Sequence, residues 1–151
     1  MKVSVGENDL VVVCDGAKAL ILENRGDSKF PNLRTREVLE HKGVQTSQLG
    51  SDRPGRVQQS VGSARAAVAQ TDWHDDAEVA FLKSVVTRLE DALQNGGYDG
   101  LIVIAPPRAL GVLRHAYSPA LRKAVKFELD KDLVRTPIHE IETMLTQGAV
   151  N

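Results

Sequence analysis

Two short, unbroken aliphatic runs constrain the fold of this chain more than any other feature. They span Leu10–Cys14 and Leu101–Ala105, and each ends at a turn-forming pair, Asp15-Gly16 or Pro106-Pro107. Both runs are too short to cross a membrane, and neither alternates between apolar and polar residues. Such runs are typical of strands that are buried on both faces in the centre of an α/β sheet. We therefore expect the functional groups to lie in the loops at the strand ends.

The composition predicts one domain of a cytoplasmic protein, formed by residues 1–151. A chain of 151 residues buries a sizeable core without disulfides or a metal. The single cysteine, Cys14, lies in the first apolar run, so it forms no intramolecular disulfide and is expected to be a buried, inert thiol. The N-terminus lacks a leader-type apolar segment, and no run of about 18 apolar residues occurs. We expect no membrane contact.

Turn residues and polar patterning place the first three strands. Asp15-Gly16 separates the first run from a second apolar stretch at Leu20–Leu22, which predicts an antiparallel hairpin with positive φ angles in its turn. The more polar segment Leu33–Glu40 predicts a third strand that shields a sheet edge with charge. Residues 42–71, rich in Gly, Ser, Gln and Arg, have little periodicity and predict a long flexible loop.

A long helix is expected after that loop. Asp75 and Glu78 have the spacing of a capping box, which predicts the start of the helix. Apolar residues then repeat at three- and four-residue spacing over 81–93, and Gly96-Gly97 predict a left-handed stop.

The remaining elements follow from proline positions and alternation. Pro107 suits the first position of a helix, and Ser118-Pro119 repeats that kind of start. Alternation over 125–129 predicts a strand, and Thr136-Pro137 opens a final helix that ends at Gly148. The predicted order β-β-β-α-β-α-β-α gives a mixed five-stranded sheet with helices on both faces. This α/β arrangement resembles the ribonuclease H-like three-layer fold.

The net charge is −1, but the charges are unevenly distributed. Two segments contain several cations and no acid: Arg53, Arg56 and Arg65 lie between Asp52 and Asp72, and Arg108, Arg114, Arg122, Lys123 and Lys126 lie between Pro106 and Phe127. A balanced total argues against tight nonspecific binding to nucleic acid, whereas local basic blocks leave room for phosphate contacts. Solvated faces of an ordinary protein are the alternative.

Five sequence blocks in a fixed order point to a family. They are Val12–Ala19, Ser51–Arg56, Thr71–His74, Ala105–Arg114 and Lys131–Leu133. Together, from about Leu10 to Leu145, the chain resembles the bacterial host attachment protein family, which is regarded as a branch of the archaeo-eukaryotic release-factor superfamily. The resemblance implies the fold of the central domain of those release factors, and docking on the ribosome or on tRNA.

The resemblance also bears on catalysis. In release factors a Gly-Gly-Gln loop before the long helix places a water against the peptidyl ester. The corresponding stretch here, Arg53–Arg65, contains Gly55, Gly62 and the pair Gln58-Gln59 but no Gly-Gly-Gln. We therefore expect a factor that binds without hydrolysing.

Two candidate sites come from polar residues around the predicted loop. Arg53 and Arg56 flank a short Pro-Gly turn, where two planar guanidiniums suit a phosphate or carboxylate; pairing with nearby Asp residues is the alternative. Asp72, His74 and Glu78 flank the start of the predicted helix and suit acid–base work or metal binding, with helix capping and a partly packed Trp73 as the alternative. The scattered histidines show no metal-ligand spacing.

Two further candidates follow the buried strands. Pro107 and Arg108 lie where open α/β sheets bind ligands, at the start of a helix; a plain strand-to-helix turn is the alternative. Asp15 ends the first strand, where a two-metal nuclease would place a carboxylate, but a hairpin turn explains it as well. The ligand or RNA-binding candidates are Asp15, Arg53, Arg56, Arg65, Asp72, His74, Pro107, Arg108, Arg114 and Lys131.

These observations favour a cytoplasmic RNA- or ribosome-binding factor without a cofactor, a bound metal or catalytic residues. The alternatives are a protein-interaction module that affects host attachment indirectly and a divalent-metal nuclease. The physiological partner and the oligomeric state do not follow from the sequence.

Overall fold

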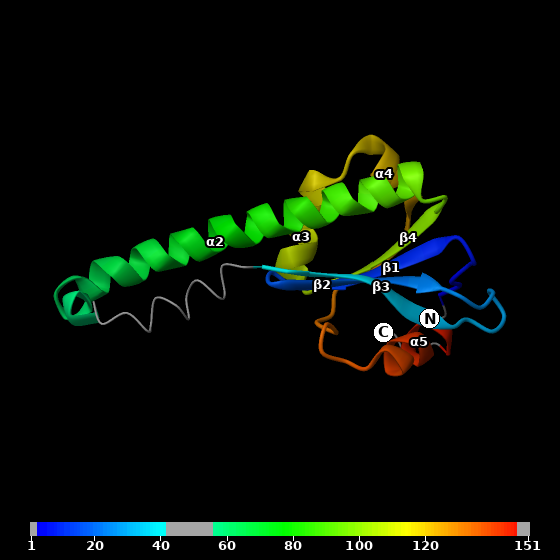
Figure 1. Ribbon diagram of the computed structural model, residues 1–151, viewed down its shortest axis with the longest axis horizontal. Coiled ribbons are helices and arrows are strands. Elements are labelled where there is room, and N and C mark those ends of the chain that lie inside the picture. Colours follow the sequence, from blue (N-terminus) through cyan, green and yellow to red (C-terminus); the bar gives the residue numbers. More distant parts are fainter. Residues whose placement is uncertain (1–2, 42–55, 148–151) are drawn as a thin grey trace.

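The computed structural model describes residues 3–41 and 56–147, and for residues 56–75 it describes the backbone only. Five strands form one sheet in the order β3-β2-β1-β4-β5 (Figure 1). Their bounds are β1 Asp9–Cys14, β2 Lys18–Asn24, β3 Leu33–Glu40, β4 Gly100–Ile104 and β5 Val125–Leu129. β2 is antiparallel to both of its neighbours, whereas β1 pairs with β4 and β4 with β5 in parallel. The predicted mixed five-stranded α/β sheet is confirmed.

The two aliphatic runs form the centre of this sheet, as predicted. Every residue of β1 and β4 is buried. Alternate residues of β1 face opposite sides, because Leu10 and Val12 belong to one apolar cluster while Val11 and Val13 belong to another. Each face of the sheet is covered by helices, which explains why neither run alternates with polar residues.

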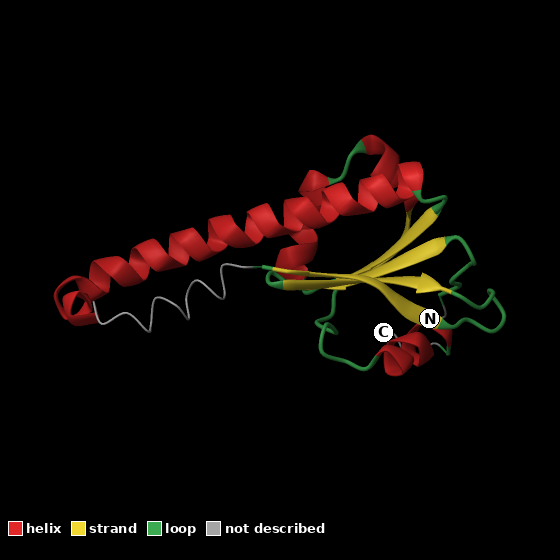
Figure 2. Ribbon diagram, viewed as in Figure 1, coloured by secondary structure: helices red, strands yellow, loops and turns green. Residues whose placement is uncertain are grey.

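Helices cover the two faces unequally (Figure 2). α2 (Arg56–Asn95), α3 (Pro107–Ala116) and α4 (Pro119–Ala124) lie on one face, and α5 (Ile138–Thr146) lies on the other. The large cluster under α2 takes in side chains from Phe81 to Ala92, and the smaller one is closed by Ile141 and Leu145. None of the helices in the described part of the chain is long and apolar enough to span a membrane.

α2 begins much earlier than the sequence predicts. It runs unbroken from Arg56, so the predicted loop is wrong for residues 56–71, and residues 42–55 lie outside the described part. Asp75 and Glu78 are interior helix positions and not a capping box. Alanines at 66, 67 and 69 are strong helix formers that support this longer helix despite its weak apolar periodicity. The predicted end is confirmed, since Gly97 follows the helix with φ +80°.

The hairpin between β1 and β2 is confirmed, but its predicted turn geometry is wrong. Positive φ in the described residues occurs at Gly97 and not at Gly16. The turn is held instead by the Asp15 carboxylate, whose Oδ1 accepts hydrogen bonds from the amides of Ala17 and Lys18, both at 2.8 Å. An aspartate that bonds to amides two and three residues ahead supplies the closure that left-handed residues would otherwise give.

The other predicted starts are largely confirmed. α3 begins at Pro107, and the Ser118 side chain caps α4 by accepting from the Leu121 amide at 3.1 Å. α5 begins at Ile138 without a side-chain cap, so the expected role of Thr136 is wrong. Its first turn is closed by the Pro137 carbonyl, which accepts from the amide of Ile141. Gly148, the predicted stop of this helix, lies outside the described residues.

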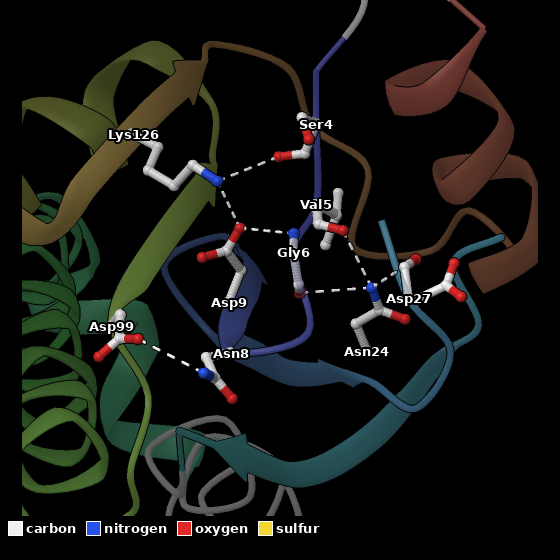
Figure 3. A network of polar contacts seen from close by, with 9 residues as sticks. All are labelled: Ser4, Val5, Gly6, Asn8, Asp9, Asn24, Asp27, Asp99 and Lys126. Carbon is white, nitrogen blue, oxygen red and sulfur yellow. Dashed lines mark hydrogen bonds and ion pairs between the residues drawn. The ribbon is translucent and has the colours of Figure 1, made fainter. Parts of the chain in front are cut away.

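A polar network ties the amino end of β1 to its surroundings (Figure 3). The Asp9 side chain, 8% exposed, accepts from Lys126 Nζ at 2.5 Å and from the Gly6 amide at 2.7 Å. The same ammonium reaches the Ser4 carbonyl at 3.2 Å. The buried Asn24 side chain donates to the carbonyls of Val5, Gly6 and Asp27. The segment before β1 is thus joined to β2 and β5 by groups that satisfy one another.

Lys126→Met should lower the free energy of unfolding by about 1–2 kcal/mol, because the buried Asp9 carboxylate is then left without the Lys126 ammonium. Urea denaturation measures the change. Arg25→Met is the matched control, since its pair with Glu23 is exposed and should be worth less than about 0.5 kcal/mol. Equal losses in the two variants would contradict a structural role for the Asp9–Lys126 pair.

Candidate functional site

The carboxyl ends of β1 and β4 meet at one edge of the sheet, opposite the Asp9 network. β1 leads into the Asp15 turn, and β4 leads through Ala105 and Pro106 into α3. Parallel strands bring these two loops together, and α3 points its amino end to the same edge. Two of the predicted candidates, Asp15 in the turn after β1 and Arg108 in the first turn of α3, therefore lie at the same edge of the sheet.

A cavity of ≈ 210 Å³ lies at this edge. The turn, α2 and α3 all contribute to its walls, which consist of Gly16, Glu78, Val79, Leu82, Pro106, Arg108, Ala109 and Val112. Two of the wall residues are charged and the others are apolar or glycine. A volume of this size accommodates a side chain or a small ligand fragment rather than a nucleotide.

Gly16 allows the close approach of the turn to α2. A Cβ atom built on Gly16 would lie 2.7 Å from Cδ of Glu78, so a larger residue would displace that side chain. Glu78 is half-buried, and its side chain lies next to Gly16. The combination of glycine and glutamate thus shapes the wall of the cavity on the β1 side.

Cys14 ends β1 directly before the turn and is fully buried. Burial, and secondarily the neighbouring Asp15 charge, raise the pKa of its thiol from 9.0 to about 12. A thiol in this setting stays protonated and is neither a nucleophile nor a metal ligand near neutral pH. The predicted inert character of Cys14 agrees with this environment.

Arg114 is held at the far end of α3 by a charged network. Its guanidinium contacts Glu128 Oε1 through Nε at 2.8 Å and through a terminal nitrogen at 2.7 Å. Tyr117 donates to the other oxygen of Glu128 at 3.0 Å, and burial followed by the Glu128 charge raises the tyrosine pKa. Arg122 lies over the Tyr117 ring and donates to the Arg114 carbonyl at 2.8 Å. The fork of Arg114 is therefore fixed while half of its side chain remains exposed.

The structure distributes the other predicted residues over three places. Arg56, Arg65, Asp72 and His74 lie on α2, in the part where only the backbone is described, and Arg53 lies outside the described residues. Pro107 is the first residue of α3, and Lys131 lies in the loop after β5. Because α2 is continuous, Arg56 and Arg65 are about two and a half helical turns apart. The predicted short turn around Arg53 and Arg56 is wrong at Arg56, which begins the helix.

The sequence interpretation missed the role of Glu78 in the cavity. Its position was available from the pattern, because Glu78 lies four residues before Leu82 and on the same stripe as Val85 and Leu89. A carboxylate among the buried positions of an amphipathic helix indicates that its side chain lines a cavity or contacts a neighbouring turn. The pairing of Arg114 with Glu128 had no such signal, since it joins a helix to a strand.

The described residues contain no group of three or more His, Cys, Asp or Glu side chains placed to hold a metal ion. Asp15 Oδ1 accepts hydrogen bonds from the turn amides, as expected if Asp15 closes a hairpin turn and does not hold a metal.

The comparison with family models decides the relationship of this chain to other proteins. Residues 8–145 match bacterial archaeo-eukaryotic release factor family 12. The chain belongs to this family. The match extends from the residue before β1 to the last turns of α5, so the sheet, the cavity and the long helix all lie within the release-factor-like region. The predicted release-factor branch is confirmed. No curated protein sequence matches the chain.

Thiol reagents at about pH 8 should react with Cys14 of the folded protein far more slowly than with the protein in urea, because the thiol is buried and protonated.

The raised pKa of Cys14 also contributes stability below about pH 9 that is lost as the pH rises toward 12. Cys14→Ala should therefore show a shallower loss of stability over this range, measured by urea denaturation at several pH values. In the reactivity experiment, equal reaction rates of Cys14 in the folded and the unfolded protein would contradict a buried, protonated thiol.

Proposed function

We propose that this protein is an RNA- or ribosome-binding factor of the release-factor type that does not hydrolyse peptidyl-tRNA. The observation that carries the proposal is the match of residues 8–145 to the bacterial release-factor family. Release factors act on the ribosome, so docking on the ribosome or on tRNA is the activity that this relationship favours.

The shape of α2 supports the same proposal. Its 40 residues give a rod of about 60 Å, and its amino-terminal half extends beyond the sheet (Figure 1). In release factors, the loop before the long helix carries the reactive Gly-Gly-Gln. An extended helix reaches into a narrow space while the body of the protein stays outside, which suits a factor that approaches a tRNA end.

The charge distribution adds a second line of support. α2 starts at Arg56 and carries Arg65 in its extended half, while Arg108 and Arg114 lie on α3. Arginine forks suit phosphate oxygens, and electrostatic interactions of this kind supply much of the affinity in RNA binding.

The proposed lack of hydrolysis rests on the sequence of the loop and the first turns of α2. No Gly-Gly-Gln occurs anywhere in the chain, and Gln58 and Gln59 lie within α2. A glutamine side chain in a regular helix lacks the turn that orients a water for attack, so the gain from orientation is absent.

Finer statements belong to the same proposal. We place the protein in the host attachment group and in the ribonuclease H-like class because of the sequence blocks and the predicted order of elements. We place it in the cytoplasm because its proposed partners are there.

Replacing Arg53, Arg56 and Arg108 with Ala should weaken sedimentation with bacterial ribosomes and binding to labelled tRNA. The slope of the logarithm of the binding constant against the logarithm of the salt concentration should become shallower. We expect a change of about one unit for each phosphate that the variant no longer neutralises. The matched control replaces Arg25, Lys29 and Arg34, which removes the same charge at the opposite end of the sheet or along its β3 edge. Weaker binding in the first variant alone is the expected result. Equal binding by the wild type and both variants would contradict a role of these arginines in RNA binding and would favour a protein-interaction function.

The purified protein should release no peptide from peptidyl-tRNA on ribosomes, and it should not cleave labelled RNA with magnesium or manganese. The variants Asp15→Asn and Gln58→Ala/Gln59→Ala separate the two chemistries. Asp15→Asn keeps an oxygen that can accept from the turn amides, so the fold should survive. Wild-type turnover that disappears in either variant would overturn the non-hydrolysing assignment and identify the reaction.

A further inference from the structure

Gly111 lies in the middle of α3, where the fold of the protein does not require a glycine. Glycine weakens a helix relative to alanine. The backbone at Gly111 has no positive φ, and a Cβ atom built there meets no atom of the described residues within 4 Å beyond the adjacent backbone of its own helix. At Gly16 and Gly100, in contrast, a Cβ would lie 2.7 Å and 2.3 Å from a carboxylate side chain. Among the described residues, the absence of a side chain at Gly111 therefore serves neither packing nor conformation.

Two of the four helical neighbours of Gly111 are arginines. Residues three and four positions away on a helix share its face, and here they are Pro107, Arg108, Arg114 and His115. All four are exposed. We call these residues and Gly111 the α3 face.

The acids near this face lie to its sides. No Asp or Glu occurs from Pro106 to Phe127. Glu78 shares the cavity wall with Arg108 on the α2 side, and Glu128 holds the Arg114 fork from β5. The centre of the α3 face is thus helix backbone without a side chain, bordered by the exposed side chains of Arg108 and Arg114.

We propose that the α3 face binds the phosphate backbone of RNA, with the RNA in direct contact with the helix backbone at Gly111. This inference rests on the proposed function and names the surface that carries it. A missing side chain lets a bulky partner approach the helix closely, and the exposed parts of the two neighbouring arginines can then contact phosphate oxygens. The charge of the face is complementary to a polyanion and not to a basic protein.

Gly111→Ala tests the inference because its expected effects on stability and on binding have opposite signs. The melting temperature should rise, since alanine is the better helix former and meets open space. Binding of fluorescently labelled tRNA, measured by anisotropy, should weaken by about tenfold, because a methyl group then separates the helix from the RNA. Gly111→Leu should weaken binding further.

Thr87→Ala is the matched control for the stability effect. Thr87 is exposed on α2, and its hydroxyl bonds back to the Lys83 carbonyl at 3.2 Å. Alanine there also improves helix propensity, but tRNA binding should stay unchanged.

The outcomes separate this inference from the proposed function. Wild-type binding to tRNA that persists unchanged in both Gly111 variants overturns the α3 face and leaves the proposed function standing. A wild-type protein that binds neither tRNA nor ribosomes overturns both. Unchanged tRNA binding without ribosome sedimentation in the Gly111 variants would also overturn tRNA as the ligand of the α3 face, because the lost contact would then be specific to the ribosome.

Discussion

The parallel pairing of β1 with β4 is the constraint on which the rest of the structure depends. Val11, Val12 and Val13 lie opposite Ile102, Val103 and Ile104, and all six are fully buried. A pair buried on both faces needs helices on both sides, and the crossover between parallel strands must be long. α2 supplies that crossover and one cover, while α5 closes the other face. The same pairing sets the loops after β1 and β4 side by side, which places the cavity.

The sequence was sufficient for the core because apolar patterning is a local signal. The buried runs, the charged edge strand at Leu33–Glu40 and the start of α3 at Pro107 were all predictable from a few neighbouring residues. The start of α2 was not, because residues 56–71 lack the apolar stripe by which a helix on a core is recognised. The turn at Asp15 was found with the wrong geometry, since a side-chain acceptor and a left-handed backbone both fit an Asp-Gly pair.

The candidate site was less predictable, because it depends on distances between elements. Arg108 was singled out from its place after a strand, but the approach of Gly16 to Glu78 joins residues 62 positions apart in the chain. Arg114 was predicted as a ligand contact, whereas its fixed position comes from Glu128 and Tyr117. Nothing in the neighbouring sequence reports such long-range partners. The sequence shows that residue 111 is a glycine. Only the structure shows that a side chain there would meet open space.

The extended half of α2 also affects how the protein melts. The described buried residues of this helix begin at Phe81, whereas the helix begins at Arg56 and extends beyond the sheet (Figure 1). A helical segment of about 20 residues that extends beyond its sheet is expected to lose its helix gradually on heating, because helix formation at this length is only weakly cooperative. The sheet and its covering helices unfold together. Loss of helical circular dichroism on heating should therefore show a gradual decline followed by a cooperative step, and only the step would report the stability of the domain.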